Sequence, residues 1–311
     1  MAQYLFGVDV GGTTVKLGLF NPEGDVIDKW EIITRKENSG DFIIGDIADS
    51  IKSVMNEKNI SVGEVIGVGI GVPGPVTEDG TVLLAANLGW GKRNISEELG
   101  ALLQVPVKAG NDANVAALGE MWRGGGQGYK DMVAVTLGTG VGGGIIIGGK
   151  IVCGATGAGG EIGHIHLEDN EPDACGCKGH GCLEQYASAT GVVRIANKKL
   201  EADSRPSILR DGEVTAKAVW DAVKAVDELA VEVAKVYGEY LGKGLAATAN
   251  VVNPQIFVIG GGVSRAGQVL IDYMKPYFEK YAFPGARGAE FGLATLGNDA
   301  GIYGAAKLVL G

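Results

Sequence analysis

Three of the four cysteines and all three histidines of the 311-residue chain lie between residues 164 and 182. The thiols in this stretch belong to Cys175, Cys177 and Cys182. Three thiolates and one imidazole make a complete tetrahedral ligand set for zinc, and sulfur ligands favour zinc over magnesium or calcium. The stretch therefore predicts a bound zinc ion.

Two glutamates flank this stretch and give it a second possible use. A metal closed over residues 164–182 would fix Glu161, His164 and Glu184 relative to one another. Two carboxylates and an imidazole in a small volume suit hydrogen bonding to several hydroxyls of a sugar. The competing interpretation is a purely structural zinc knuckle, beside which both glutamates are only solvated.

The composition is that of a folded, acidic protein. Hydrophobic residues make up 46% of the chain and charged residues 21%, so disorder is not indicated. A net charge of −10 argues against a nucleic-acid partner. No long apolar run and no signal-peptide pattern is present, so we expect a cytoplasmic protein without a membrane span. Glycine is the outlier at 53 residues, more than double the usual share of about 7%.

Two glycine turns, each between two strands, suit phosphate binding. The first follows Asp9 and comprises Gly11, Gly12 and Thr13, where backbone amides are free of side-chain bulk. Asp9 is placed to hold Mg²⁺, although a hairpin turn with a paired aspartate is the simpler interpretation. We also expect Lys16, on the following strand, to face the phosphates.

The second turn lies 127 residues later and has the residues Gly138, Thr139 and Gly140. An internal repeat of this kind predicts two similar lobes. The spacing of glycines in 138–143 matches a dinucleotide-binding fingerprint. That motif requires a helix directly after the turn, whereas an apolar strand follows here, so we reject it.

Two further segments stand at junctions between a strand and a helix. Gly261 and Gly262 belong to a triple-glycine turn that could carry the adenosine part of a nucleotide or simply form a tight turn. Asn111 and Asp112 precede a helix, where Asp112 is either a helix cap or a general base for phosphoryl transfer.

The order of elements predicts an α/β fold with two lobes. We expect a small lobe of residues 1–120 plus 298–311 and a large lobe of residues 121–297. Strands are predicted at 4–10, 15–20, 26–30, 65–72, 105–108, 133–137, 145–147, 150–152 and 255–259. Helices are predicted at 42–58, 97–103 (capped by Ser96), 113–122, 187–200, 215–226, 229–249, 265–281 and 299–310.

The motifs, taken together and in order, resemble those of the ROK family of sugar kinases and repressors, and within it the bacterial glucokinases. The segments that carry the resemblance are 9–13, 71–75, 111–112, 161–164 and 175–184. The resemblance implies a two-lobed, actin-like (ribonuclease H-like) ATPase fold built on a duplicated β-meander. It also implies an ATP-dependent transfer of phosphate to the 6-hydroxyl of glucose, and a homodimer or homotetramer.

The resemblance further implies the role of each site residue. Zn²⁺ would be structural and bound by His164, Cys175, Cys177 and Cys182, with His166 and His180 as weaker alternatives. Asp112 would be the catalytic base. Glucose would contact Gly74, Asn87, Asn111, Asp112, Glu161, His164 and Glu184. ATP with Mg²⁺ would lie along Asp9, Gly11, Gly12, Thr13, Lys16, Gly138, Thr139, Gly140, Gly261 and Gly262.

Three other functions remain to be weighed. A kinase for N-acetylmannosamine, N-acetylglucosamine or fructose would share every motif. A repressor of the same family would need a helix-turn-helix domain ahead of the first turn, and only eight residues precede Asp9. A non-catalytic sugar sensor is disfavoured by the presence of Asp112 and both glycine turns.

Overall fold

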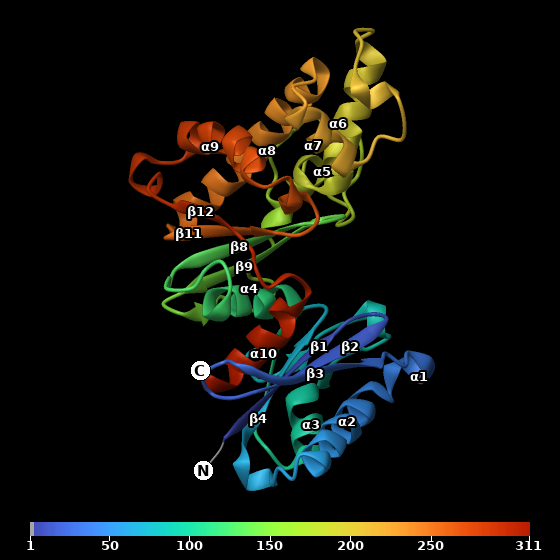
Figure 1. Cartoon of the computed structure of the whole chain (residues 1–311), viewed down its shortest axis with the longest axis vertical. Helices are drawn as coiled ribbons and strands as arrows, with labels where there is room; N and C mark the ends of the chain where they lie inside the picture. Colours follow the sequence, from blue (N-terminus) through green and yellow to red (C-terminus); the bar gives the residue numbers. More distant parts are fainter. Residues whose placement is uncertain (1–2) are drawn as a thin grey trace. The chain divides into compact units, whose positions relative to one another are not determined.

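A computed structural model of the protein describes residues 3–311, and its chain divides into two compact units. The first unit comprises residues 1–130, 144–160 and 295–311, and the second comprises residues 131–143 and 161–294. Each unit contains most or all of one five-stranded sheet, shown for the first unit mainly in blue in Figure 1.

The first sheet has the strand order β3-β2-β1-β4-β7. Its strands are β1 (Tyr4–Val10), β2 (Thr14–Phe20), β3 (Val26–Ile33), β4 (Val65–Val72) and β7 (Val107–Asn111). The first three pair antiparallel as a meander, and β4 and β7 then continue the sheet in parallel from β1. Two short strands, β5 (Thr81–Val82) and β6 (Arg93–Asn94), pair separately.

Side chains that alternate along the strands of this sheet belong to two separate apolar layers, one on each face. Leu17 and its neighbours on one face pack against α2 (Ile43–Glu57) and α3 (Ile95–Leu103), whose apolar positions recur at helical spacing. Leu5 and Phe20 on the other face pack against α10 (Ala300–Leu310), which also lies along α4 (Asp112–Arg123) (Figure 1). A short turn of helix, α1 (Glu37–Gly40), precedes α2.

Glycines allow α10 to approach the sheet and α4 at backbone distance. A Cβ atom added at Gly69 on β4 would lie 1.7 Å from the carbonyl oxygen of Ala305. One added at Gly304 would lie 1.7 Å from the carbonyl oxygen of Val115. No side chain fits at such distances, so this packing requires glycine at both positions.

The second sheet repeats the order of the first, as β10-β9-β8-β11-β12. Its strands are β8 (Met132–Leu137), β9 (Val141–Ile147), β10 (Lys150–Ile151), β11 (Ile256–Gly260) and β12 (Glu290–Leu293). Strands β8, β11 and β12 run parallel, and β9 and β10 form an antiparallel hairpin. The predicted duplication of the meander is therefore present in the strand order of the two sheets.

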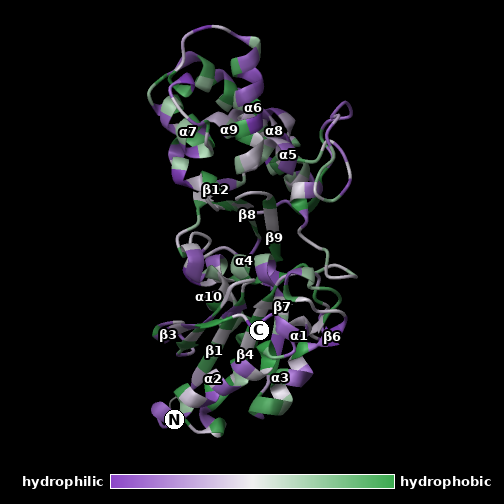
Figure 2. Ribbon diagram, turned by 90° about the vertical axis from the view of Figure 1, so that its right-hand side faces the viewer, coloured by the Kyte–Doolittle hydropathy of each residue, from purple (hydrophilic) through white to green (hydrophobic). Residues whose placement is uncertain are grey.

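Helices make up most of the second unit. They are α5 (Glu184–Ala187), α6 (Ala189–Ala202), α7 (Ala216–Lys224), α8 (Glu228–Val252) and α9 (Gln268–Tyr281). The side chains of Ser188, Thr215 and Asp227 cap α6, α7 and α8 through the expected bond to a first-turn amide. Hydrophilic residues are prominent along α6 in Figure 2. Short 3₁₀ turns complete the chain (η1 Val62–Glu64, η2 Ala86–Leu88, η3 Ile162–His164, η4 Ile208–Arg210, η5 Val263–Ala266, η6 Pro284–Ala286, η7 Gly297–Asp299).

The division between the units differs from the boundaries expected at 120/121 and 297/298. The chain passes from one unit to the other at 130/131, 143/144, 160/161 and 294/295. Glu120 explains two of these differences, because its buried carboxylate accepts N–H groups from Gly125, Thr295 and Leu296 at 2.9–3.1 Å. These bonds attach both neighbouring segments to α4 and so to the first unit.

Three differences from the local predictions have a clear physical reason. Asn94 rather than Ser96 caps α3, because its side chain accepts the N–H of Glu97 and the helix begins at Ile95. Strand β7 extends to Asn111, so it reaches the predicted active-site pair directly. Strand β12 was not predicted, because its four residues are too few to show an alternating pattern.

The part of the chain that the structure describes contains no helix long and apolar enough to cross a membrane.

Candidate active site

The first unit brings Asp9 and the Asn111–Asp112 pair into one electrostatic neighbourhood. Burial above all, together with the neighbouring Asp112 carboxylate, raises the pKa of Asp9 to about 6, against an opposing effect of Lys16. Lys16 stands opposite Asp9 in the β1–β2 register, and its Nζ donates to the backbone oxygen of Asn298 at 3.1 Å. Two carboxylates that repel one another at a buried site are a common mark of function.

The first glycine turn is held by a threonine that the sequence interpretation missed. Gly11 N–H donates to the carbonyl of Thr14 at 3.0 Å. The buried Thr34 closes the turn from β3's end, because its hydroxyl donates to Gly11 O at 2.7 Å and its N–H donates to Thr13 O at 2.9 Å. A Cβ added at Gly12 would meet no atom within 4 Å, so this side of the turn is open to a ligand.

Asn111 and not Asp112 caps α4. The Asn111 Oδ1 accepts the N–H of Asn114 at 3.1 Å, while its Nδ2 donates to Asp112 Oδ1 at 3.0 Å and to Gly74 O at 3.1 Å. Asp112 Oδ1 also accepts the N–H of Ala113 at 2.8 Å. The simpler interpretation of Asp112 as the helix cap is therefore wrong, because its neighbour holds that position.

Gly74 and Asn87, two further residues predicted to contact the sugar, lie in the segment between β4 and α3. Gly74 has φ +92°, and a Cβ there would lie 2.1 Å from the oxygen of Leu84, so the loop closes on itself only with glycine. Asn87 is exposed on η2. The buried Asn114 Nδ2 reaches the carbonyl of Gly159 at 3.4 Å and so connects α4 with the loop before Glu161.

In the second unit, the four predicted metal ligands converge. The ligand atoms of His164, Cys175, Cys177 and Cys182 all lie within 4.8 Å of one another. Cys177 Sγ and Cys182 Sγ are 3.6 Å apart, and Cys175 Sγ is 3.8 Å from His164 Nδ1. A tetrahedral zinc ion with metal–sulfur bonds of about 2.3 Å requires ligand separations of about 3.8 Å.

The donor set fits zinc in its chemistry as well. Burial raises the pKa of Cys182 to about 12, whereas the backbone N–H of Gly179 lowers that of Cys177. A bound dication would supply the charge that keeps all three sulfurs deprotonated. The two alternative histidines face elsewhere: His166 contacts Asp169 and the oxygen of His180, and His180 contacts the oxygen of Glu171.

The two glutamates adjoin this cluster. Glu161 Oε2 is 3.9 Å from His164 Nε2, whereas the other ring nitrogen, Nδ1, is the one near Cys175 Sγ. Glu184 Oε1 is 3.6 Å from Cys175 Sγ, and its Oε2 accepts the N–H of Val141 at 2.9 Å. A Cβ at Gly140 would lie 2.1 Å from this carboxylate oxygen. Glu184 thus connects the metal cluster with the second glycine turn.

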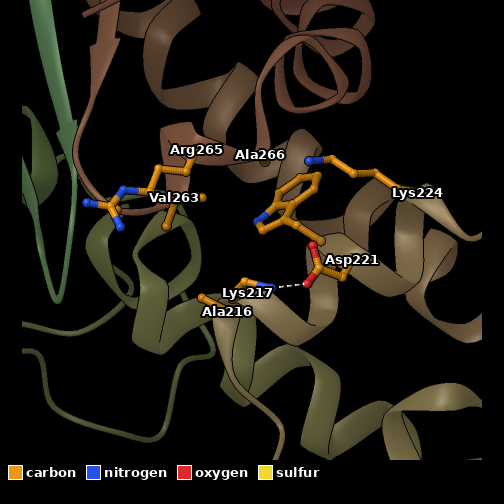
Figure 3. Close-up of a pocket in the computed structure, with 9 residues that line it drawn as sticks. Ala216, Lys217, Asp221, Lys224, Val263, Arg265 and Ala266 are labelled. Carbon is orange, nitrogen blue, oxygen red and sulfur yellow. Dashed lines mark hydrogen bonds and ion pairs between the residues drawn. The ribbon is translucent and has the colours of Figure 1, made fainter. Parts of the chain in front are cut away.

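A pocket in the same unit lies beside the triple-glycine turn. It has a volume of about 220 Å³ and is lined by α7 and by Gly262, Val263, Arg265 and Ala266. Figure 3 shows Lys217, Asp221 and Lys224 on one side, with Val263 and Arg265 opposite; Lys217 Nζ and Asp221 form an ion pair at 2.5 Å. The Gly261 backbone packs on Leu137 with φ +84°, whereas a Cβ at Gly262 would meet nothing within 4 Å.

The sequence was compared with protein families and with known proteins. The model of the ROK family matches residues 5–311. The chain belongs to the ROK family. A glucokinase from Halalkalibacterium halodurans is 44% identical over 99% of this chain and 95% of its own length. A glucokinase from Thermotoga maritima is 36% identical over 98% of this chain and 96% of its own.

A crystal structure of a ROK family glucokinase from Streptomyces griseus, in complex with glucose and AMPPNP, is similar throughout. It is 35% identical, covers 98% of both chains and has a TM-score of 0.71. With the two repeated sheets, this places the ROK chain in the α/β class with the actin-like ATPase fold.

Proposed function

We propose that this ROK protein is an ATP-dependent glucokinase, which transfers the γ-phosphoryl group of ATP to the 6-hydroxyl of glucose. The observation that carries the proposal is the cluster of His164 and three cysteines beside Glu161 and Glu184, in a chain 44% identical to a glucokinase over almost its whole length. A zinc-binding site flanked by hydrogen-bond acceptors is suited to a polyhydroxyl substrate better than to an apolar one.

The residues proposed to bind the sugar have different chemical roles. Glu161, Glu184 and His164 hydrogen-bond hydroxyl groups of the sugar in this proposal. His164, Cys175, Cys177 and Cys182 would hold Zn²⁺, which would fix the spacing of these groups. Gly74, Asn87 and Asn111 are further sugar contacts in this proposal. Because Asn111 Nδ2 donates to Asp112 Oδ1, the amide also holds the orientation of the base.

Asp112 accepts the proton of the attacking hydroxyl as it bonds to phosphorus, and ADP is the leaving group. The backbone amides of two glycine turns bind the phosphates in this proposal, and these turns comprise Gly11, Gly12 and Thr13, and Gly138, Thr139 and Gly140. Asp9 would hold Mg²⁺, directly or through water, and the metal would neutralise charge on the phosphates. Lys16 adds a positive charge opposite Asp9 in the β1–β2 register.

Adenosine occupies the pocket of Figure 3 in this proposal. The open side of Gly262 admits a base or ribose at backbone distance, and the face of α7 closes the other wall. Gly261 shapes the turn by packing on Leu137.

The decisive experiment is ADP release with glucose, fructose, N-acetylglucosamine, N-acetylmannosamine and N-acetylgalactosamine as acceptors, with the product's phosphorylated position identified by NMR. We expect the highest kcat/KM for glucose and phosphate on oxygen 6. A preference for an acetamido sugar would replace glucokinase with another ROK hexose kinase, and no transfer to any sugar would favour a sensor.

Metal content and assembly are tested separately. We expect one zinc per chain by elemental analysis of purified protein, and a metal-free, fully active sample would contradict this. We also infer a cytoplasmic homodimer or homotetramer, which light scattering on a sizing column would identify.

A further inference from the structure

The second glycine turn is held by the corner between α5 and α6, residues Glu184–Thr190, entirely within the second unit. Ala189 N–H donates to the carbonyl of Gly138 at 2.8 Å. The hydroxyl of Thr190 contacts the carbonyl of Thr139 at 2.9 Å, and Glu184 receives the N–H of Val141. The carbonyls of Gly138 and Thr139 and the N–H of Val141 are therefore all hydrogen-bonded to this corner.

The hydroxyl bonds of the corner have a fixed direction. A carbonyl oxygen can only accept, so the Thr190 hydroxyl must donate its hydrogen to Thr139. It is then free to accept from Ser188 Oγ, 2.9 Å away, which itself accepts the N–H of Gly191 at 2.9 Å. Ser188 is fully buried, so this chain of donors begins in the core and ends at the turn.

The Thr190 side chain has no comparable structural task elsewhere among its described contacts. It is exposed, and the cap of α6 is provided by Ser188. Removing the Thr190 hydroxyl therefore leaves the helix cap in place but releases the carbonyl of Thr139. The Thr139 carbonyl would lose the side-chain donor that it has among the described residues, and this bond would no longer fix the direction in which the neighbouring amides point.

We propose that Thr190 is a positioning residue for nucleotide binding, which holds the Gly138–Gly140 turn in the shape that receives the phosphates. The inference rests on the proposed function, because that function assigns the turn to ATP. Thr190 does not touch the nucleotide in this proposal; it acts through the Thr139 peptide.

The test compares Thr190→Val, which removes the hydroxyl at nearly constant volume, with Thr190→Ser, which keeps it. One net hydrogen bond is worth about 1 kcal/mol, so Thr190→Val should raise the KM for ATP about fivefold. Thr190→Ser should stay within about twofold of the wild type. The glucose KM and the zinc content should be nearly unchanged in both, whereas Thr190→Val should lower the melting temperature modestly, because the buried Ser188 hydroxyl loses its acceptor. Calorimetric titration with ADP should show the same weakening without turnover.

Three outcomes would overturn the inference. They are an unaltered nucleotide affinity in Thr190→Val, equal changes in both KM values, and a Thr190→Ser variant as impaired as Thr190→Val. If the wild type transfers no phosphate to any hexose, the proposed function fails first. An active wild type with an unaffected Thr190→Val variant rejects only the role of Thr190.

Discussion

Asp112 is the residue whose substitution best separates chemistry from structure. Asn111 caps α4, and an asparagine at 112 keeps an oxygen for the bonds from Asn111 Nδ2 and Ala113 N–H. An amide cannot take the proton of the sugar hydroxyl, so Asp112→Asn should lower kcat by at least about a hundredfold. Steady-state assays check this, with glucose binding and melting temperature expected to change little.

The matched control is Asp227→Asn, the same atomic change at the cap of α8. It should leave kcat within about twofold. If Asp112→Asn keeps more than about a tenth of the wild-type kcat, the general base is another group.

Glu161 and Glu184 should differ in a way the sequence did not predict. Both are proposed to accept sugar hydroxyls, so each glutamine variant should raise the glucose KM about tenfold. Glu184 also accepts the N–H of Val141, and a neutral glutamine oxygen accepts it more weakly than a carboxylate, so Glu184→Gln should raise the ATP KM as well, whereas Glu161→Gln should not. The exposed Glu201→Gln serves as the control. An unchanged ATP KM in Glu184→Gln would show that Glu184 does not connect sugar binding with the second glycine turn.

At the scale of elements, the loop before the cysteines is attached to α6 by a buried ion pair. Arg194 donates to both oxygens of Glu171 at 2.7 and 2.8 Å, and Tyr186 adds a hydroxyl donor. These bonds outweigh burial and hold the pKa of Glu171 at about 2, below its ordinary value of 4.5. The Glu171 side chain is only 2% exposed, so solvent screens the pair little.

The pH dependence follows from the direction of this shift. A lowered pKa means that the ionised form stabilises the fold fully above pH 4.5, and that this contribution declines as the pH falls toward 2. Glu171→Gln should therefore lower the unfolding free energy by about 3 kcal/mol at pH 7. The difference in unfolding free energy between this variant and the wild type should narrow below about pH 4, as measured by denaturant titrations. Glu213→Gln, at an exposed site, should show no such trend.

The sequence predicted the elements and the ligand set better than the contacts that hold them. Periodicity located the major helices and most strands within a few residues, and the repeated turn indicated the duplicated sheet. The cluster of His164 with three cysteines was predicted because its members lie close in the chain. Thr34 and Thr190 could not be found in this way, since each acts on a turn distant in sequence and neither belongs to a recognisable motif.

At the scale of the whole molecule, α10 completes the first unit from the far end of the chain. Gly304→Ala would place a methyl group 1.7 Å from the Val115 carbonyl, so α4 and α10 must separate. Such overpacking typically lowers the unfolding free energy by about 1–3 kcal/mol, and urea titration should show at least this loss. Gly45→Ala in α2 meets no atom within 4 Å and should be neutral or stabilising by up to about 1 kcal/mol, because alanine favours a helix.

The position of α10 also sets an order for synthesis. The second unit ends at residue 294, so all of its residues leave the ribosome before the first unit can be completed. Residues 300–310 form α10. Until they emerge, no helix covers the face of β1 and β4 on which α10 packs at Gly69, and α4 lacks its contact with α10. The first unit, although its synthesis begins earliest, is thus the last to be completed, and its apolar sheet face stays exposed to other chains until then.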